Sequence, residues 1–247
     1  MKSALKWSSL GLLVYVVFLI AKLPAVHVIS NIQLPAGVNV GGISGSIWNG
    51  QMQRAQANGL PISNLSWQLS FFPLLIGEVS ADIKAGNVRD IEQISANGHV
   101  SVSSQGIQAE DVVAYVPTDL VVSMLTLPVP VQAGGRLKVQ LNELSYKAGC
   151  QTALGKGQWL NANYTGTAGT IDLGNFDADL GCQKGNIVVD VKQPNSFGLT
   201  AKALIPANLN FKVEGRFKPN ANLPKEVHQA AQFFGKTDAN GYYPIKF

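Results

Sequence analysis

The first candidates for chemistry are the cysteines. Cys150 and Cys182 are the only two in the chain, and they lie 32 positions apart. This spacing excludes a CxxC redox motif, and two cysteines alone cannot supply a four-ligand zinc site. If the chain is exported to an oxidising compartment, we expect the two cysteines to form a disulfide bond. The alternative is a pair of buried thiols.

The other residue types used in catalysis do not form a known motif. The three histidines, His27, His99 and His228, lie far apart, and none belongs to a metal-ligand motif. The segment Gly149–Lys156 resembles a phosphate-binding loop, but it has five residues where four are required. No serine lies in a GxSxG motif. We therefore predict no catalytic residue, no cofactor and no bound metal, and a protein that is not an enzyme.

Composition excludes further classes of protein. Of the 247 residues, 46% are hydrophobic and 14% are charged. The apolar content is too high for a wholly disordered chain. The net charge is +4, but two of the basic residues, Lys2 and Lys6, lie at the very start, and the rest of the chain is nearly neutral. A nucleic-acid-binding face needs clustered basic residues, so we expect no nucleic-acid partner.

The N-terminal segment has the pattern of a membrane anchor. Lys2 and Lys6 precede an uncharged run, Trp7–Ala21. The run is shorter than the roughly 20 residues of a typical span, but Lys22 can extend its ammonium group to the interface and apolar residues continue to Val28. The two lysines predict a cytoplasmic N-terminus, because positive charge stays on the inner side of a membrane.

Two other interpretations of this segment remain open, a cleaved signal peptide and a buried core helix. A signal peptide needs small residues before the cleavage site, and neither Leu19–Ala21 nor Leu23–Ala25 meets this requirement well. We therefore expect a cytoplasmic stub and transmembrane anchor in residues 1–29 and a single exported domain in residues 30–247.

Beyond residue 37, apolar and polar residues alternate, which is typical of half-buried β-strands. The alternating segments are 65–71, 79–84, 99–103, 136–142, 187–192, 197–201 and 208–217. Turn signals, among them Asn97-Gly98 and Gly134-Gly135, separate them.

Two short helices are expected, at residues 109–116 and 224–234, the second starting at Pro224 and ending before Gly235. Two short helices cannot cover so many strands, so the sheet must largely cover itself. We predict a mainly β fold, in which an N-terminal transmembrane helix is followed by a highly curved antiparallel sheet, half-barrel or sandwich-like, with one or two short helices.

Several motifs together resemble the type II secretion system protein N family. The segment Gly42–Gly50 (GISGSIWNG) resembles the family's G-x-s-G-[ST]-[IL]-W-x-G signature, and Leu65–Leu69 follows at the expected distance. The cysteine pair is similar in its context, and Asp238–Phe247 resembles the family's C-terminal pattern. The family-like residues are Gly42, Gly45, Trp48, Gly50, Trp67, Gly241 and Tyr243.

This resemblance covers essentially the whole chain. It implies an inner-membrane-anchored, mostly periplasmic subunit of the machine that exports folded proteins across the outer membrane, with other secretion components as partners. The family has no catalytic residues to carry over, so the implied function is binding. The strand pattern is also similar to that of AsmA-like proteins, whose curved sheets can hold lipid.

Two alternative functions follow. A lipid-handling envelope protein would hold phospholipid in an apolar groove lined by residues such as Trp67, Phe71, Leu137 and Phe211. A periplasmic enzyme would need polar groups that converge in a pocket.

Structural roles are expected first for the motif residues. Gly42, Gly45 and Gly50 permit sharp turns or bulges, and Trp48 would close the end of the curved sheet. The tail, residues 241–247, is expected to dock as an edge strand on its own sheet. The alternative for both segments is contact with a partner.

Overall fold

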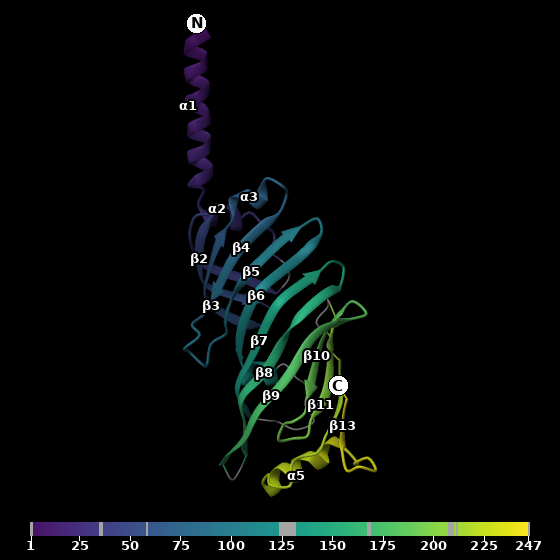
Figure 1. Ribbon diagram of the computed structural model, residues 1–247. Coiled ribbons are helices and arrows are strands. Elements are labelled where there is room, and N and C mark those ends of the chain that lie inside the picture. Colours follow the sequence, from purple (N-terminus) through teal and green to yellow (C-terminus); the bar gives the residue numbers. More distant parts are fainter. Residues whose placement is uncertain are drawn as a thin grey trace.

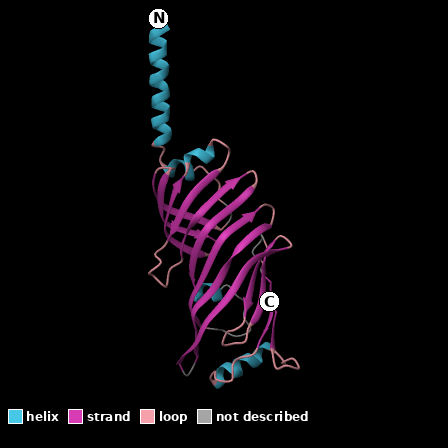
Figure 2. Ribbon diagram, in the orientation of Figure 1, coloured by secondary structure: helices cyan, strands magenta, loops and turns pink. Residues whose placement is uncertain are grey.

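The computed structural model of the chain describes residues 2–34, 37–57, 59–123, 132–166, 169–206, 210 and 212–246. A helix projects from one end of a long, curved sheet (Figures 1 and 2). The helices are α1 (Lys2–Ala21), α2 (Ala25–Ile29), α3 (Phe71–Leu74), α4 (Thr118–Ser123), α5 (Lys225–Ala231) and the 3₁₀ helix η1 (Gln232–Phe234). The strands are β1 (Val38–Gly45), β2 (Asn49–Ala57), β3 (Leu60–Leu69), β4 (Val79–Ala85), β5 (Ser95–Ser103), β6 (Gly106–Pro117), β7 (Ala133–Tyr146), β8 (Cys150–Gly166), β9 (Gly169–Gln183), β10 (Asn186–Lys192), β11 (Thr200–Ile205), β12 (Lys212–Phe217) and β13 (Tyr243–Lys246).

The 13 strands formed by the described residues belong to one antiparallel sheet, in the order in which they occur along the chain. The sheet is curved but open, with β1 and β13 as its edges (Figure 1). This confirms the prediction of a mainly β fold with a curved antiparallel sheet. The apolar residues that predicted β4 and β5 pair with one another, Ala81 with Val100 and Val79 with Val102. Val79 and Val102 are nevertheless exposed, and Ser80 and Ser101 on the other face are buried.

Among the described residues, no helix combines the length and the apolar character that crossing a membrane requires. The transmembrane helix and the division into residues 1–29 and 30–247 stay predictions. The segment after α1 packs close to the sheet, and Ala25 at the start of α2 is fully buried there.

The helix predicted at residues 109–116 is wrong. These residues lie in β6, which pairs with β5 and β7 over most of its length, and the neighbouring helix, α4, begins only at Thr118. A short apolar run such as this one can form either a helix or a strand. Its β-branched valines favour a strand, and pairing with strands on both sides stabilises that conformation. The helix predicted at 224–234 is confirmed as α5 and η1, and Val227 and Ala231 form its buried face.

Two predicted turns lie within strands instead, each opposite a β-bulge in the facing strand. Register shifts occur between Asn97 and His99 in β5 and between Gly134 and Arg136 in β7. A Cβ atom on Gly98 would lie 2.6 Å from Cγ2 of Val112 in the facing strand. Glycine is thus required here for close approach of two strands, as at many bulges.

Some predicted strand ends also differ. Phe71 starts α3 instead of extending β3, and Phe197 lies in the turn before β11. Leu209, Phe211 and Phe247 lie outside the described residues.

The hydrophobic core lies in the C-terminal half of the sheet. Ala162, Leu173 and Phe176 are buried together, and Trp159 and Phe197 pack against them. A chain of aromatic contacts then runs through Phe197 to Phe217 and on to Phe234 beside α5, with ring centroids 6.1 and 5.1 Å apart. Helix α5 lies at the lower end of the sheet in Figure 2, and its residues Val227 and Ala231 are buried there.

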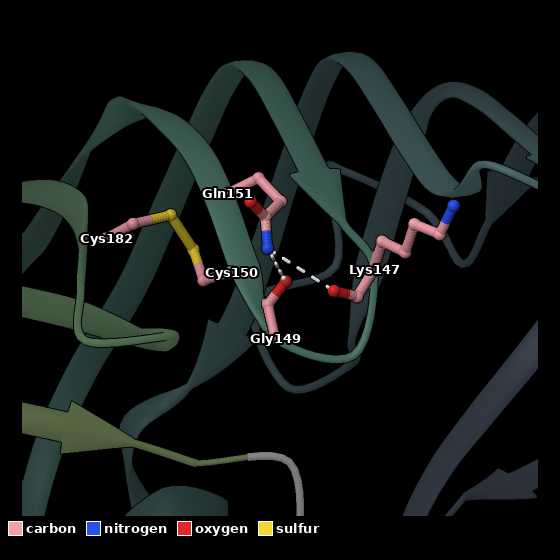
Figure 3. Close-up of a disulfide and its surroundings, with 5 residues drawn as sticks. All are labelled: Lys147, Gly149, Cys150, Gln151 and Cys182. Atoms are coloured by element: carbon pink, nitrogen blue, oxygen red, sulfur yellow. Dashed lines mark hydrogen bonds between the residues drawn. A yellow bond between two sulfur atoms is a disulfide. The ribbon is translucent and has the colours of Figure 1, made fainter.

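The two cysteines form the predicted disulfide bond, with their Cα atoms 5.5 Å apart. Figure 3 shows that it joins the start of β8 to the end of β9. The side-chain amide of Gln151 donates to the backbone carbonyls of Lys147 and Gly149, which holds the β7–β8 turn beside the bond. The disulfide therefore joins the neighbouring strands β8 and β9 just beyond the last pair of their ladder, Gly155 with Leu180.

Replacing both Cys150 and Cys182 with alanine should lower the free energy of unfolding by about 3–4 kcal/mol, because the unfolded chain would lose its 32-residue loop closure. Urea unfolding of the detergent-solubilised chain, followed by tryptophan fluorescence, measures the change. Reductant should lower the midpoint of the natural chain and leave that of the double variant unchanged. Equal midpoints for the oxidised natural chain and the double variant would contradict this role.

Candidate functional site at the junction of the first helix and the sheet

The glycine–tryptophan motif lies in the β1–β2 hairpin, next to the end of α1. The indole N–H of Trp48 donates a hydrogen bond to the backbone carbonyl of Ile20, over 2.8 Å. Ile20 lies in the last turn of α1, where backbone carbonyls have no partner within the helix. Trp48 thus caps the helix from the sheet side.

The backbone reinforces this link. The backbone N–H of Ile47 donates to the carbonyl of Leu23 over 3.0 Å, and Pro24 forms an isolated antiparallel bridge with Ser46. The residues that leave α1 therefore run along the tip of the β1–β2 hairpin like an additional short strand.

Trp67 supports the hairpin from β3. Its indole N–H donates to the carbonyl of Ile47 over 2.9 Å. Gly50 makes this packing possible, since an added Cβ atom would lie 2.2 Å from Cζ2 of Trp67. Gly45 has a φ of +83°, and a Cβ atom there would meet the Asn49 carbonyl oxygen at 2.5 Å. Both glycines are thus needed for the hairpin geometry.

The remaining glycine of the motif, Gly42, is less constrained. It has a φ of +70°, and an added Cβ atom would meet the side chain of Gln53 at 2.9 Å. The Gln53 side chain can move aside more easily than backbone can. The positive φ, rather than the lack of space for a Cβ atom, therefore favours glycine at this position.

The C-terminal motif residues lie elsewhere. Gly241, with a φ of +79°, is in the turn before β13, and Tyr243 packs on Phe217 at 5.5 Å. The backbone N–H groups of Tyr242 and Asn240 donate to the Asp238 carboxylate in this turn, which holds the pKa of Asp238 below its usual value. Strand β13 is docked on β12 as an edge strand.

Comparison with known proteins identifies the family. The family model for type II secretion system (T2SS) protein N matches residues 36–246. The chain belongs to the type II secretion system protein N family. Curated relatives named type II secretion system protein N include one from Vibrio cholerae, 29% identical, and one from Aeromonas hydrophila, 27% identical. The alignments cover 99% and 100% of this chain and 98% of each relative. No solved structure matches the chain.

The match to the protein N family spans both groups of motif residues, which the fold keeps apart. Gly42, Gly45, Trp48, Gly50 and Trp67 gather at the junction with α1, whereas Gly241 and Tyr243 lie at the other edge of the sheet. Figure 1 shows the two ends of the sheet well separated. The residues selected from the sequence thus form two sites.

A third group was missed in the sequence. Ser80 Oγ lies 2.8 Å from His99 Nε2, and His99 Nδ1 lies 2.9 Å from Asp82 Oδ1. This is the order of groups in the catalytic triad of serine hydrolases. Ser80 and Asp82 share one face of β4, and Asp82 pairs with His99 on β5. The alternation in the two strands could have revealed the group, had their register been known.

The environment of this group differs from that of a hydrolase. Ser80 is only 4% exposed. The Asp82 side chain is 61% exposed, whereas the triad aspartate of a hydrolase is buried. Ser80 also lies within a regular strand rather than at a sharp turn. Among the described residues, no group of three His, Cys, Asp or Glu side chains could hold a metal ion.

An apolar cavity of about 280 Å³ lies between the sheet and α5. Its walls include Leu199, Phe217, Val227, Ala230 and Phe234. The groove residues predicted from the sequence are not among those that line it: Trp67 lines a separate polar pocket with Asp82 and His99, Phe71 lies in α3, Leu137 is in β7, and Phe211 is outside the described residues.

The Gly50→Ala variant tests the packing at the junction. The new methyl group would displace Trp67, so we expect a loss of about 1–3 kcal/mol in the free energy of unfolding, measured by denaturant titration. Gly41→Ala is the matched control, because an added Cβ atom there meets nothing within 4 Å. If the two variants were equally stable, the contact between Gly50 and Trp67 would not hold the hairpin.

Proposed function

We propose that this chain is a non-enzymatic subunit of the type II secretion system, anchored in the inner membrane by α1 with its sheet in the periplasm. Membership of the protein N family, across residues 36–246, is the observation that carries the proposal. The subunit acts by binding other components of the secretion machine.

The surface of α1 supports anchoring. Leu12, Tyr15 and Phe18 are 64%, 61% and 62% exposed, which is unfavourable in water and favourable in lipid. No charged residue lies between Lys6 and Lys22. The hydrogen bond from Trp48 to the Ile20 carbonyl links the end of this helix directly to the sheet.

The disulfide bond supports a periplasmic location. Disulfides persist in the periplasm and are rare in the bacterial cytosol, where thiols are kept reduced. The bond between Cys150 and Cys182 lies in the sheet, so it is the sheet that would need the oxidising compartment.

A binding role, rather than catalysis, is supported by the buried position of Ser80. Its hydrogen bond to His99 joins β4 to β5, and His99 in turn contacts Asp82. We assign this chain of hydrogen bonds a structural role.

The edge strand β13 is the proposed contact with another component. Its outer side has no strand partner among the described residues, and unpaired strand edges accept an additional strand. Lys246 is exposed there.

A photo-crosslinking amino acid at Lys246, tested in cells, should give an adduct that contains another secretion component. The same amino acid at Lys202 is the matched control, because Lys202 is exposed on β11, which is paired on both sides. Mass spectrometry identifies the adducts, and the Lys246 adduct should disappear in cells that lack the other secretion genes. Identical adducts at both positions, or a Lys246 adduct that persists in those cells, would contradict the proposal.

The cavity under α5 favours a second candidate function, the binding of an apolar chain from a lipid. Its volume, about 280 Å³, is just below the roughly 300–1,000 Å³ of ligand pockets, so it suits one acyl chain rather than a whole phospholipid. Ala230 and Val227 of α5 are among the residues that line it.

This second function can be tested by filling the cavity. If lipid is bound there, native mass spectrometry of the purified chain should show a lipid adduct that Ala230→Trp reduces several-fold. Gln229→Trp is the control, because Gln229 is exposed on the same helix and does not line the cavity. A lipid adduct that both variants retain, or a chain that carries none, would exclude this site.

A further inference from the structure

The turn after β3 presents a cluster of apolar side chains to solvent. Phe72, Leu75 and Ile76 are 80%, 69% and 81% exposed. The segment Ser70–Gly77 (SFFPLLIG) contains no charged residue. Leaving three large apolar side chains in water is costly, and such clusters mark contact surfaces.

The backbone holds this cluster in a defined shape. The N–H groups of Leu75, Ile76 and Gly77 donate to the carbonyls of Phe72, Pro73 and Leu74, each over 3.1 Å. The N–H of Glu78 also donates to Pro73, over 3.0 Å. The three exposed side chains therefore project from a hydrogen-bonded turn.

The turn is attached to the same residue that caps α1. Phe71 packs on Trp48 with ring centroids 5.5 Å apart, and the backbone N–H of Leu69 donates to the Trp48 carbonyl over 2.7 Å. Trp48 in turn donates to Ile20 of α1. Figure 1 shows α3 beside the lower end of α1, at the level where that helix meets the sheet.

We propose that Phe72, Leu75 and Ile76 insert into the membrane interface beside α1, as a second membrane contact. The inference rests on the proposed anchoring, since α1 places the turn at the membrane surface. An uncharged cluster of one aromatic and two aliphatic side chains suits the boundary between headgroups and acyl chains. Lys22, exposed at the end of α1, complements anionic headgroups at the same level.

Two membrane contacts, α1 and the turn at α3, would restrict the orientation of the sheet more than α1 alone. A single helix leaves the body free to tilt and rotate about the membrane normal. A second contact through α3, joined rigidly to the first by Trp48, fixes the inclination of the sheet relative to the bilayer. The far edge strand, β13, would then be held at a constant height in the periplasm.

The test uses the full chain in vesicles of phosphatidylethanolamine and phosphatidylglycerol. Ile76→Cys carries an environment-sensitive nitrobenzoxadiazole label, while Cys150 and Cys182 remain oxidised. Ile91→Cys is the matched control, since Ile91 is 70% exposed and lies at the opposite end of β4. Seven residues of β4, at about 3.3 Å each, separate the two positions. Leu12→Cys reports on α1.

A nitroxide-bearing lipid should quench the label at position 76 several-fold more than the label at position 91, and aqueous iodide should show the reverse order. Equal quenching at 76 and 91, with position 12 quenched by the lipid, would overturn the second contact and leave the anchor in place. Lack of lipid quenching at position 12 would overturn the anchor itself. Protection of position 76 from both quenchers would identify protein as the occupant and also overturn the inference.

Discussion

Hydrogen bonding between each strand and its neighbours in sequence constrains every other feature of this molecule. Because the order along the sheet is β1 to β13, position along the chain becomes position along the sheet. Residues near the N-terminus therefore cannot meet residues near the C-terminus, and the two groups of motif residues occupy opposite ends. One end carries α1 and its junction, and the other carries α5 and the free edge of β13 (Figure 1).

The two ends are stabilised by different interactions. Around α5, aromatic rings from β8, β9 and β12 form the core, with Leu173 and Phe176 only 3% and 4% exposed. Near α1, hydrogen bonds from two indoles hold the hairpin instead. In the middle of the sheet, the Arg136 guanidinium donates to the carbonyls of Val88 and Gln93 and thereby fixes the β4–β5 loop. By contrast, the apolar side chains of α1 and of the turn at α3 face outward.

The sequence predicted the strands well where alternation was regular, as in β4 and β10. It did not predict which face is buried, because Ser80 is the buried side chain of β4 near the exposed Val79, and Val188 is the buried residue of β10. It failed where pairing decided the outcome. The run at 109–116 is ambiguous by itself, and only the ladders on both sides of β6 make it a strand. Asn97-Gly98 has the composition of a turn, but it lies within β5, where Gly98 faces the bulge at Val112 of β6. The partner of the Trp48 indole, 28 residues away in sequence, depends on the path of the chain after α1, which no local pattern encodes.

The central claim is that α1 holds the sheet on the periplasmic side of the inner membrane. Protease digestion of intact spheroplasts carrying an epitope tag after residue 247 tests it most directly. The account predicts that protease removes the tag and degrades the sheet without lysis of the inner membrane, while a small fragment containing α1 stays in the membrane fraction. Complete protection of the tag until the inner membrane is lysed would place the sheet in the cytoplasm and contradict the account.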